Sequence, residues 1–102
     1  MKIVGQTVDE QTRCVHYHSE KDVVALKMYC CNKWYPCYQC HNENESHRLQ
    51  PWPQEERMTH AIFCGVCRQT MSIETYQQVS SCPYCQTAFN PNCSLHESIY
   101  FE

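Results

Sequence analysis

The most informative absence in this chain is that of large apolar residues. Leucine, isoleucine, valine and phenylalanine together make up only 17 of its 102 residues, a share that in an ordinary chain favours disorder. A domain of this size also buries only a modest fraction of its surface, so it needs a further source of stability. The sequence therefore predicts that disulfide bonds or bound metal ions hold the fold together.

Long apolar runs are absent as well. No stretch approaches the roughly 18 apolar residues of a membrane span. The first residues, MKIVGQTVDEQTR, lack the apolar segment and the small-residue cleavage site of a secretory signal. We therefore expect no membrane association and a reducing compartment, the cytoplasm, where clustered cysteines indicate metal binding. The alternative is a secreted domain whose signal has been removed.

Positive charge is scarce. Eight lysines and arginines against eleven acidic residues give a net charge of −3, and the basic residues form no run. Nine metal-bound thiolates and three Zn²⁺ ions would bring the charge to about −6. Because proteins that bind phosphate backbones present a basic face, nucleic acid is not an expected partner. A nucleic-acid-binding zinc finger stays open only if the scattered basic residues cluster in space.

What the chain has in abundance is cysteine, with ten cysteines accompanied by six histidines. Three cysteine pairs have C-x-x-C spacing, which on a tight turn lets both thiolates reach one tetrahedral Zn²⁺ about 2.3 Å from each sulfur. The second and third pairs are separated by fourteen residues, as in a zinc ribbon. Gly65 and Pro83 are expected to shape the two turns. The predicted ribbon ligands are Cys64, Cys67, Cys82 and Cys85.

The first C-x-x-C pair predicts another metal site. Cys37 and Cys40 should share one ion. Upstream, Cys14 and His16 are two residues apart, and in an extended segment such residues project to the same face. The two pairs together supply four ligands for one metal ion.

The remaining candidates around this pair form a set of Cys2His2 type. His41 directly follows Cys40 and should therefore point away from the first site. The second set consists of Cys30, Cys31, His41 and His47. The adjacent Cys30 and Cys31 can bind one ion only if the backbone turns sharply there. The alternative is that the two thiols divide between two sites.

Three sets of four ligands leave no open position for water, so the zinc is expected to be structural and the protein not to be an enzyme. The strongest catalytic alternative is a formal match to the zinc deaminase signature H-x-E…P-C-x-x-C, formed by His18, Glu20 and 36–40. Only fifteen residues separate Glu20 from Pro36. This spacing leaves little room for the helix and strand that such an enzyme needs.

The order and spacing of these motifs resemble the CHY-type zinc finger family. The resemblance is carried by C-V-H-Y at Cys14–Tyr17, by C-C-N-K-W-Y-P-C-Y-Q-C-H at Cys30–His41, by His47, and by the two later C-x-x-C pairs. It implies a module that binds three zinc ions through the twelve residues named above. In some relatives the module precedes a RING domain of a ubiquitin ligase, but no residues remain here for a RING, so ligase activity is not expected.

Short standalone members of this family offer a closer resemblance. They include a mitochondrial intermembrane-space protein that helps small Tim proteins to assemble, and the tail FNPNCSLHESIYF is similar to theirs. The expected function is a zinc-binding module that interacts with another protein. The alternative is a helper that handles zinc or thiols for a client protein.

The predicted fold is a small, metal-stabilised α+β domain with short strands and short helices. Its N-terminal half resembles a zinc finger and its C-terminal half a zinc ribbon. We expect a single CHY-type domain over 1–102, with the first two zinc sites in 1–50 and the ribbon site and tail in 60–102.

Local patterns place the elements of this fold. Apolar and β-branched residues predict short strands within 2–8, 23–29 and 61–64. The polar, proline-punctuated segment 42–57 predicts a loop between the halves. Ser72 is expected to cap a short helix.

Cys93 and His96 are left over by the count of three sites. On a helix that begins at 90–91, positions i and i+3 face the same way, so the two side chains can chelate one ion together. His18 and His60 are the only other histidines available to complete a fourth site. The alternatives are a packed cysteine beside surface histidines and a redox-active thiol.

Overall fold

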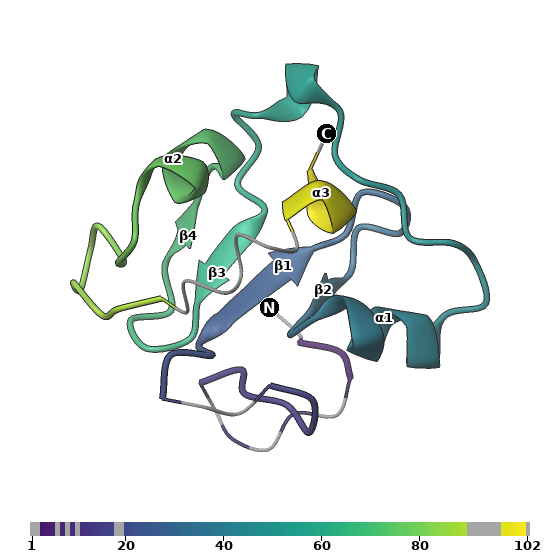
Figure 1. Cartoon of the computed structure of the whole chain (residues 1–102), viewed down its shortest axis with the longest axis horizontal. Coiled ribbons are helices and arrows are strands. Elements are labelled where there is room, and N and C mark those ends of the chain that lie inside the picture. Colours follow the sequence, from purple (N-terminus) through teal and green to yellow (C-terminus); the bar gives the residue numbers. More distant parts are fainter. Residues whose placement is uncertain are drawn as a thin grey trace.

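The computed structural model describes residues 3–5, 7, 9, 11–17, 20–89 and 97–101. At its centre lies a four-stranded antiparallel sheet with the strand order β2-β1-β3-β4. Helix α2 lies beside β4 at one end of the sheet and α1 beside β2 at the other (Figure 1). The elements are β1 (Val24–Lys27), β2 (Trp34–Tyr35), α1 (Tyr38–Asn44), the 3-10 turn η1 (Gln54–Glu56), β3 (Ile62–Cys64), β4 (Thr70–Met71), α2 (Ile73–Gln78) and α3 (Glu97–Tyr100).

One sheet joins the two halves of the chain. Strand β1 pairs with β2 of its own half, where Leu26 lies opposite Tyr35. On its other edge β1 pairs with β3 of the ribbon half, where Val24 lies opposite Cys64. The α+β fold with a finger-like and a ribbon-like half is confirmed. The two halves are nevertheless not separate bodies, because their central strands form one ladder.

Two of the three predicted strands are confirmed, as β1 and β3 lie within 23–29 and 61–64. The described residues of 2–8 form no strand, so that prediction is wrong for them. Ile3 makes only an isolated bridge to Trp34. The reason is Gly5, whose positive φ of 112° interrupts an extended backbone. A Cβ atom there would lie 2.8 Å from the Cβ of Cys40, so glycine lets this segment cross the metal-binding region.

The polar segment 42–57 is less loop-like than its composition indicates. Its first residues belong to α1, and η1 lies near its end. Trp52 is only 6% exposed, and its indole Nε1 donates a hydrogen bond to the carbonyl oxygen of Lys27 (2.7 Å). Its backbone N–H donates to the carbonyl of Tyr100 (2.7 Å). This tryptophan therefore connects the linker, by hydrogen bonds, to both the end of β1 and the C-terminal helix.

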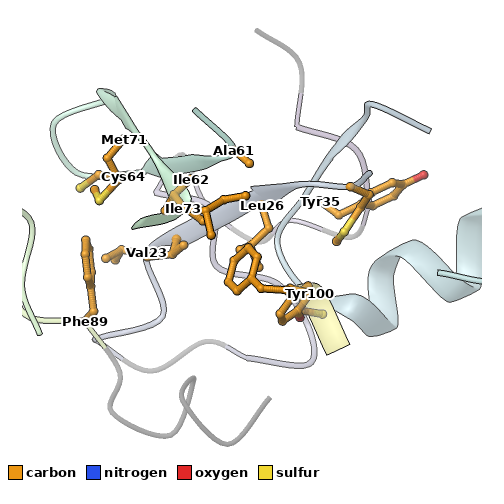
Figure 2. Packing of buried hydrophobic residues seen from close by; sticks show 14 of the residues in the cluster. Val23, Leu26, Tyr35, Ala61, Ile62, Cys64, Met71, Ile73, Phe89 and Tyr100 are labelled. Carbon is orange, nitrogen blue, oxygen red and sulfur yellow. The ribbon is translucent and has the colours of Figure 1, made fainter. Parts of the chain in front are cut away.

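The apolar core is small and lies around the central strands. Figure 2 shows Leu26 of β1, Ile62 of β3, Ile73 of α2 and Tyr100 of α3 in one cluster. Five of the cysteines also belong to this cluster of buried residues, and four more pack against it. Packing and metal-ligand chemistry therefore share the same interior.

The helix predicted after Ser72 is confirmed as α2. The Ser72 hydroxyl oxygen accepts a hydrogen bond from the backbone N–H of Thr75 (3.2 Å), which satisfies one of the free donors at the helix start. Ile73 faces the core. The predicted helix start at 90–91 lies outside the described residues. None of the described helices is both long and apolar enough to cross a membrane.

Candidate metal centre

Twelve cysteine and histidine side chains meet in three groups of four. Within each group the ligand atoms all lie within 4.8 Å of one another. The groups have the same membership as the three sets predicted from the sequence. Site 1 is Cys14, His16, Cys37 and Cys40; site 2 is Cys30, Cys31, His41 and His47; site 3 is Cys64, Cys67, Cys82 and Cys85.

The distances between sulfur atoms distinguish a shared metal from a disulfide. The Sγ atoms of Cys14 and Cys37 are 3.7 Å apart, and those of Cys67 and Cys82 are 3.6 Å apart. A disulfide bond requires about 2.05 Å. Two thiolates on a tetrahedral Zn²⁺ are separated by about 3.8 Å, given Zn–S bonds of about 2.3 Å. The described cysteines form no disulfide with one another, and their geometry fits a shared metal ion.

The first turn of site 3 is fixed by two backbone hydrogen bonds. Arg68 N–H donates to the Cys64 carbonyl (2.7 Å), and Cys64 N–H donates to the Gln69 carbonyl (2.9 Å). Arg68 has a positive φ of 64°. Gly65 was expected to shape this turn, but its φ angle is not positive, so the backbone conformation of the turn does not require a glycine there. A Cβ atom there would lie 2.3 Å from the carbonyl oxygen of Gln11, so Gly65 is needed for a close backbone approach.

The second turn of site 3 repeats the first. Gln86 N–H donates to the Cys82 carbonyl (2.8 Å), and Cys82 N–H donates to the Thr87 carbonyl (2.9 Å). Gln86 has the corresponding positive φ, 66°. Two copies of one backbone turn therefore present the four thiolates of the ribbon.

A third copy of this turn answers the question of the adjacent cysteines. Asn32 N–H donates to the Met28 carbonyl (2.8 Å), and Met28 N–H donates to the Lys33 carbonyl (2.9 Å). Asn32 has a positive φ of 57°. Cys31 thus occupies the place of the second cysteine in a C-x-x-C turn, while Met28 stands in the place of the first. The turn supplies the sharp bend that brings Cys30 and Cys31 into the same site.

Helix α1 carries ligands of two sites. Cys37 is its N-cap, and the Cys37 sulfur accepts a hydrogen bond from the backbone N–H of Cys40 (3.4 Å). Cys40 and His41 are 1% and 0% exposed. Successive helical residues point about 100° apart, so Cys40 faces site 1 and His41 faces site 2, as the sequence predicted.

The histidines present different ring nitrogens to their sites. His16 turns Nδ1 towards the sulfurs of Cys37 (3.6 Å) and Cys40 (3.5 Å). His41 and His47 turn Nε2 inward, 3.1 Å from each other and each 3.3 Å from the Cys30 sulfur. The donor atoms of sites 1 and 2 therefore converge at separations near those that a tetrahedral zinc ion requires.

In site 1 the thiols of Cys14 and Cys37 have different pKa values. A hydrogen bond with the Cys37 thiol lowers the pKa of Cys14 to about 5, against the opposing effect of burial, and the same interaction raises the pKa of Cys37. In site 3, burial raises the pKa of Cys64 to about 12. Sites 1 and 3 thus hold protons that a metal ion must displace, so metal binding there releases protons and depends on pH.

The tail contributes a contact that local sequence patterns did not reveal. The Tyr100 hydroxyl oxygen accepts a hydrogen bond from the backbone N–H of Tyr38 (2.7 Å). Tyr38 is the first residue of α1, whose initial N–H groups have no partner within the helix. Tyr100 therefore supports the helix that carries ligands of sites 1 and 2.

The predicted fourth site lies largely outside the described residues, because Cys93, His96 and His18 are all outside them. His60 is described, and its Nδ1 lies 3.2 Å from the hydroxyl of Thr70. It belongs to none of the three groups.

Comparison with protein-family models matches residues 14–95 to the CHY zinc finger. The chain belongs to the CHY zinc finger family. This membership confirms the resemblance drawn from the motifs. Together with the three ligand groups, it makes the chain a zinc-binding module.

This CHY zinc finger chain is similar to short proteins of three yeasts. It is 45% identical to Helper of Tim protein 13 of Saccharomyces cerevisiae over an alignment that covers 98% of this chain and 90% of that protein. It is 40% identical to Helper of Tim protein 13 of Kluyveromyces lactis, covering 98% and 88%. An uncharacterized protein of Schizosaccharomyces pombe is 42% identical, with coverage of 98% and 88%. The similarity thus extends over nearly the whole length of this chain and of each relative.

Proposed function

We propose that this CHY module is a non-enzymatic protein that binds three zinc ions through the twelve ligands of sites 1 to 3, and that it acts by binding another protein. The observation that carries the proposal is the number of ligands in each group. Four protein ligands complete the tetrahedral coordination of Zn²⁺ and leave no position for water or substrate. The zinc ions would then be structural, and the function would lie on the surface that they hold in shape.

The names of the relatives point to the kind of partner. Two relatives that match over 98% of this chain are called Helper of Tim protein 13. We propose a Tim protein as the client. The sequence by itself favoured the cytoplasm, whereas a Tim client favours the mitochondrial intermembrane space, the compartment of one short standalone member of the family. Fractionation of host cells that express the tagged chain distinguishes the two compartments.

The two turns of site 3 offer an exposed apolar surface for such a client. Val66 and Tyr84 lie between the cysteines of the two turns and are 40% and 55% exposed. Single exposed apolar residues are common on protein surfaces. Here each of two matching turns carries one at its tip, beside the same metal site.

The test is co-purification of the tagged full chain from its native host, after cross-linking in intact mitochondria. We expect Tim proteins among the captured partners. We also expect weaker capture by Val66→Ser with Tyr84→Ser, while Met58→Ser, at a position that is 70% exposed, serves as the control. Absence of Tim proteins from the capture, with zinc still bound to the chain, would contradict the proposed client.

The second candidate function is zinc or thiol handling, and one observation favours it. His47 is the one exposed residue among the twelve proposed ligands, with a side chain that is 38% exposed. Zinc exchange would begin there. A handling protein loses one zinc readily and exposes a reactive thiolate, whereas a scaffold keeps all of its zinc and shows inert thiols. The rates of zinc loss to a chelator and of thiol alkylation separate the two functions.

A further inference from the structure

The ring nitrogen of His16 that faces away from site 1 has a partner. Nε2 lies 2.9 Å from the Glu43 carboxylate oxygen Oε2, while Nδ1 faces the site 1 sulfurs. An ionised carboxylate can only accept a hydrogen bond, so Nε2 carries the proton. The lone pair of Nδ1 is then directed into the site, as a zinc ligand requires.

His41 is held in the opposite sense by its neighbour. Its Nδ1 lies 2.9 Å from the side-chain oxygen of Asn42, while Nε2 faces site 2. The amide oxygen accepts a hydrogen bond, so Nδ1 carries the proton and Nε2 offers its lone pair to the site. The two histidines therefore use different nitrogens because they have different partners.

The two partners, Asn42 and Glu43, are consecutive residues of α1 and both are exposed. Successive helical residues point about 100° apart, which lets one reach the ring of His41 and the other that of His16. The surface ion pair of Glu43 and His16 would by itself contribute little to stability. However, the His16 side chain is only 14% exposed, and its second nitrogen is already directed at the sulfurs. The contact with Glu43 therefore acts on the orientation of a metal ligand rather than as a surface ion pair alone.

We propose that Glu43 and Asn42 are positioning residues that fix the tautomer and ring orientation of His16 and His41, and so set the zinc affinity of sites 1 and 2 separately. The inference rests on the proposed ligand sets. Groups that hydrogen-bond a ligating histidine typically change metal affinity by about 10- to 100-fold. Among the described residues, His47 has no equally close partner for its Nδ1, which is 3.7 Å from Glu45 Oε1, so its ring should be less firmly oriented.

The test uses the full chain loaded with cadmium, because cadmium NMR resonances respond to the number of sulfur ligands. Sites with three, two and four cysteines should give three separate signals. We expect Glu43→Ala to move the site 1 signal and Asn42→Ala to move the site 2 signal in the fully loaded protein. In zinc competition with a chelator, each substitution should weaken its own site by about 10- to 100-fold and leave site 3 unchanged.

Three control variants make the outcome decisive. Glu43→Gln loses the charge but keeps an acceptor, so it should restore most of the affinity of site 1. Glu55→Ala removes an exposed glutamate from η1 and should change no site. His16→Ala removes a proposed ligand and should abolish the site 1 signal.

Two results have different meanings. If His16→Ala leaves the site 1 signal in place, the proposed ligand set is wrong. If His16→Ala abolishes that signal while Glu43→Ala and Asn42→Ala move neither signal, or weaken the same site equally, the ligand set stands and the positioning inference is overturned.

Discussion

Sites 1 and 2 are interleaved along the chain, whereas site 3 is self-contained. The ligand pairs of sites 1 and 2 alternate between residues 14 and 47, so each site closes a loop that contains ligands of the other. Site 3 uses two similar turns within residues 64–85. Ordering a loop costs conformational entropy. Sites 1 and 2 therefore share that cost, while site 3 bears its own.

Removal of all metal should have the largest effect. Structural zinc can contribute about 10 kcal/mol or more per site, and the apolar core of this chain is small. We expect a strong chelator, under reducing conditions, to unfold both halves. Circular dichroism with parallel metal analysis measures this. A metal-free, reduced sample that kept its fold would show that the core suffices.

Loss of a single ligand should separate the interleaved sites from the self-contained one. Cys37→Ser removes a site 1 ligand and should also release the zinc of site 2, because the loop that carries Cys30 and Cys31 is no longer closed. Cys85→Ser should release the zinc of site 3 alone. Metal analysis of the purified variants gives the count, and equal losses in both would mean that interleaving does not couple the sites.

Substitution of two different ligands of site 3 should disturb the structure to different extents. Cys64 lies in β3 opposite Val24 of β1, whereas Cys85 lies outside the sheet. We expect Cys64→Ser to increase amide hydrogen exchange in β1 as well as in the ribbon. Cys85→Ser should leave β1 protected. Equal protection of β1 in the two variants would indicate that the halves are independent despite their shared sheet.

Loss of the Tyr100 hydroxyl should have a smaller effect, confined to the interleaved sites. Tyr100→Phe leaves the N–H of Tyr38 without this acceptor, and a lost hydrogen bond of this kind costs about 1 kcal/mol. We expect a lower unfolding temperature and faster zinc loss from site 1, with site 3 unchanged. Tyr84→Phe, at an exposed position, is the control. Zinc loss from site 3 at the same increased rate would refute a local role.

The smallest effect concerns pH. Hydrogen bonds from Lys33 and Tyr35 lower the pKa of Glu45 to about 2 from 4.5. The stabilisation from this lowered pKa is fully present above pH 4.5 and is lost progressively as the pH falls from 4.5 to about 2. Proton competition at the thiolates should release zinc before this loss is complete. Glu45→Gln should therefore barely shift the midpoint of acid-induced zinc loss, and a large shift would give Glu45 a direct part in it.

The features that the sequence predicted are those with a local signature. C-x-x-C spacing identifies a turn without knowledge of the rest of the fold, and an apolar β-branched run identifies β1. The grouping of Cys30, Cys31, His41 and His47 followed by elimination, since the other ligands were already paired. These inferences needed only short stretches of chain or a count of candidates.

The features that the sequence did not reveal depend on contacts between distant segments. Tyr38 and Tyr100 are 62 positions apart, and no pattern at either residue indicates the other. Gly65 read as a turn residue because its true neighbour, Gln11, is far away in sequence. Asn42 and Glu43 were predicted to lie in a loop, and their partners are defined only by which ring nitrogen of each histidine faces a metal site.

The turn at Met28–Lys33 shows that the backbone of a zinc turn does not require two cysteines. Its hydrogen bonds and its positive φ at the fifth residue match those of the two ribbon turns, yet it holds a methionine in the first position. The bend is thus a property of the main chain, and it positions the sulfur ligands that the turn carries. When the first thiol lies two positions later on the same backbone turn, it faces a different set of metal ligands. One turn can in this way supply both a ribbon and a mixed cysteine and histidine site.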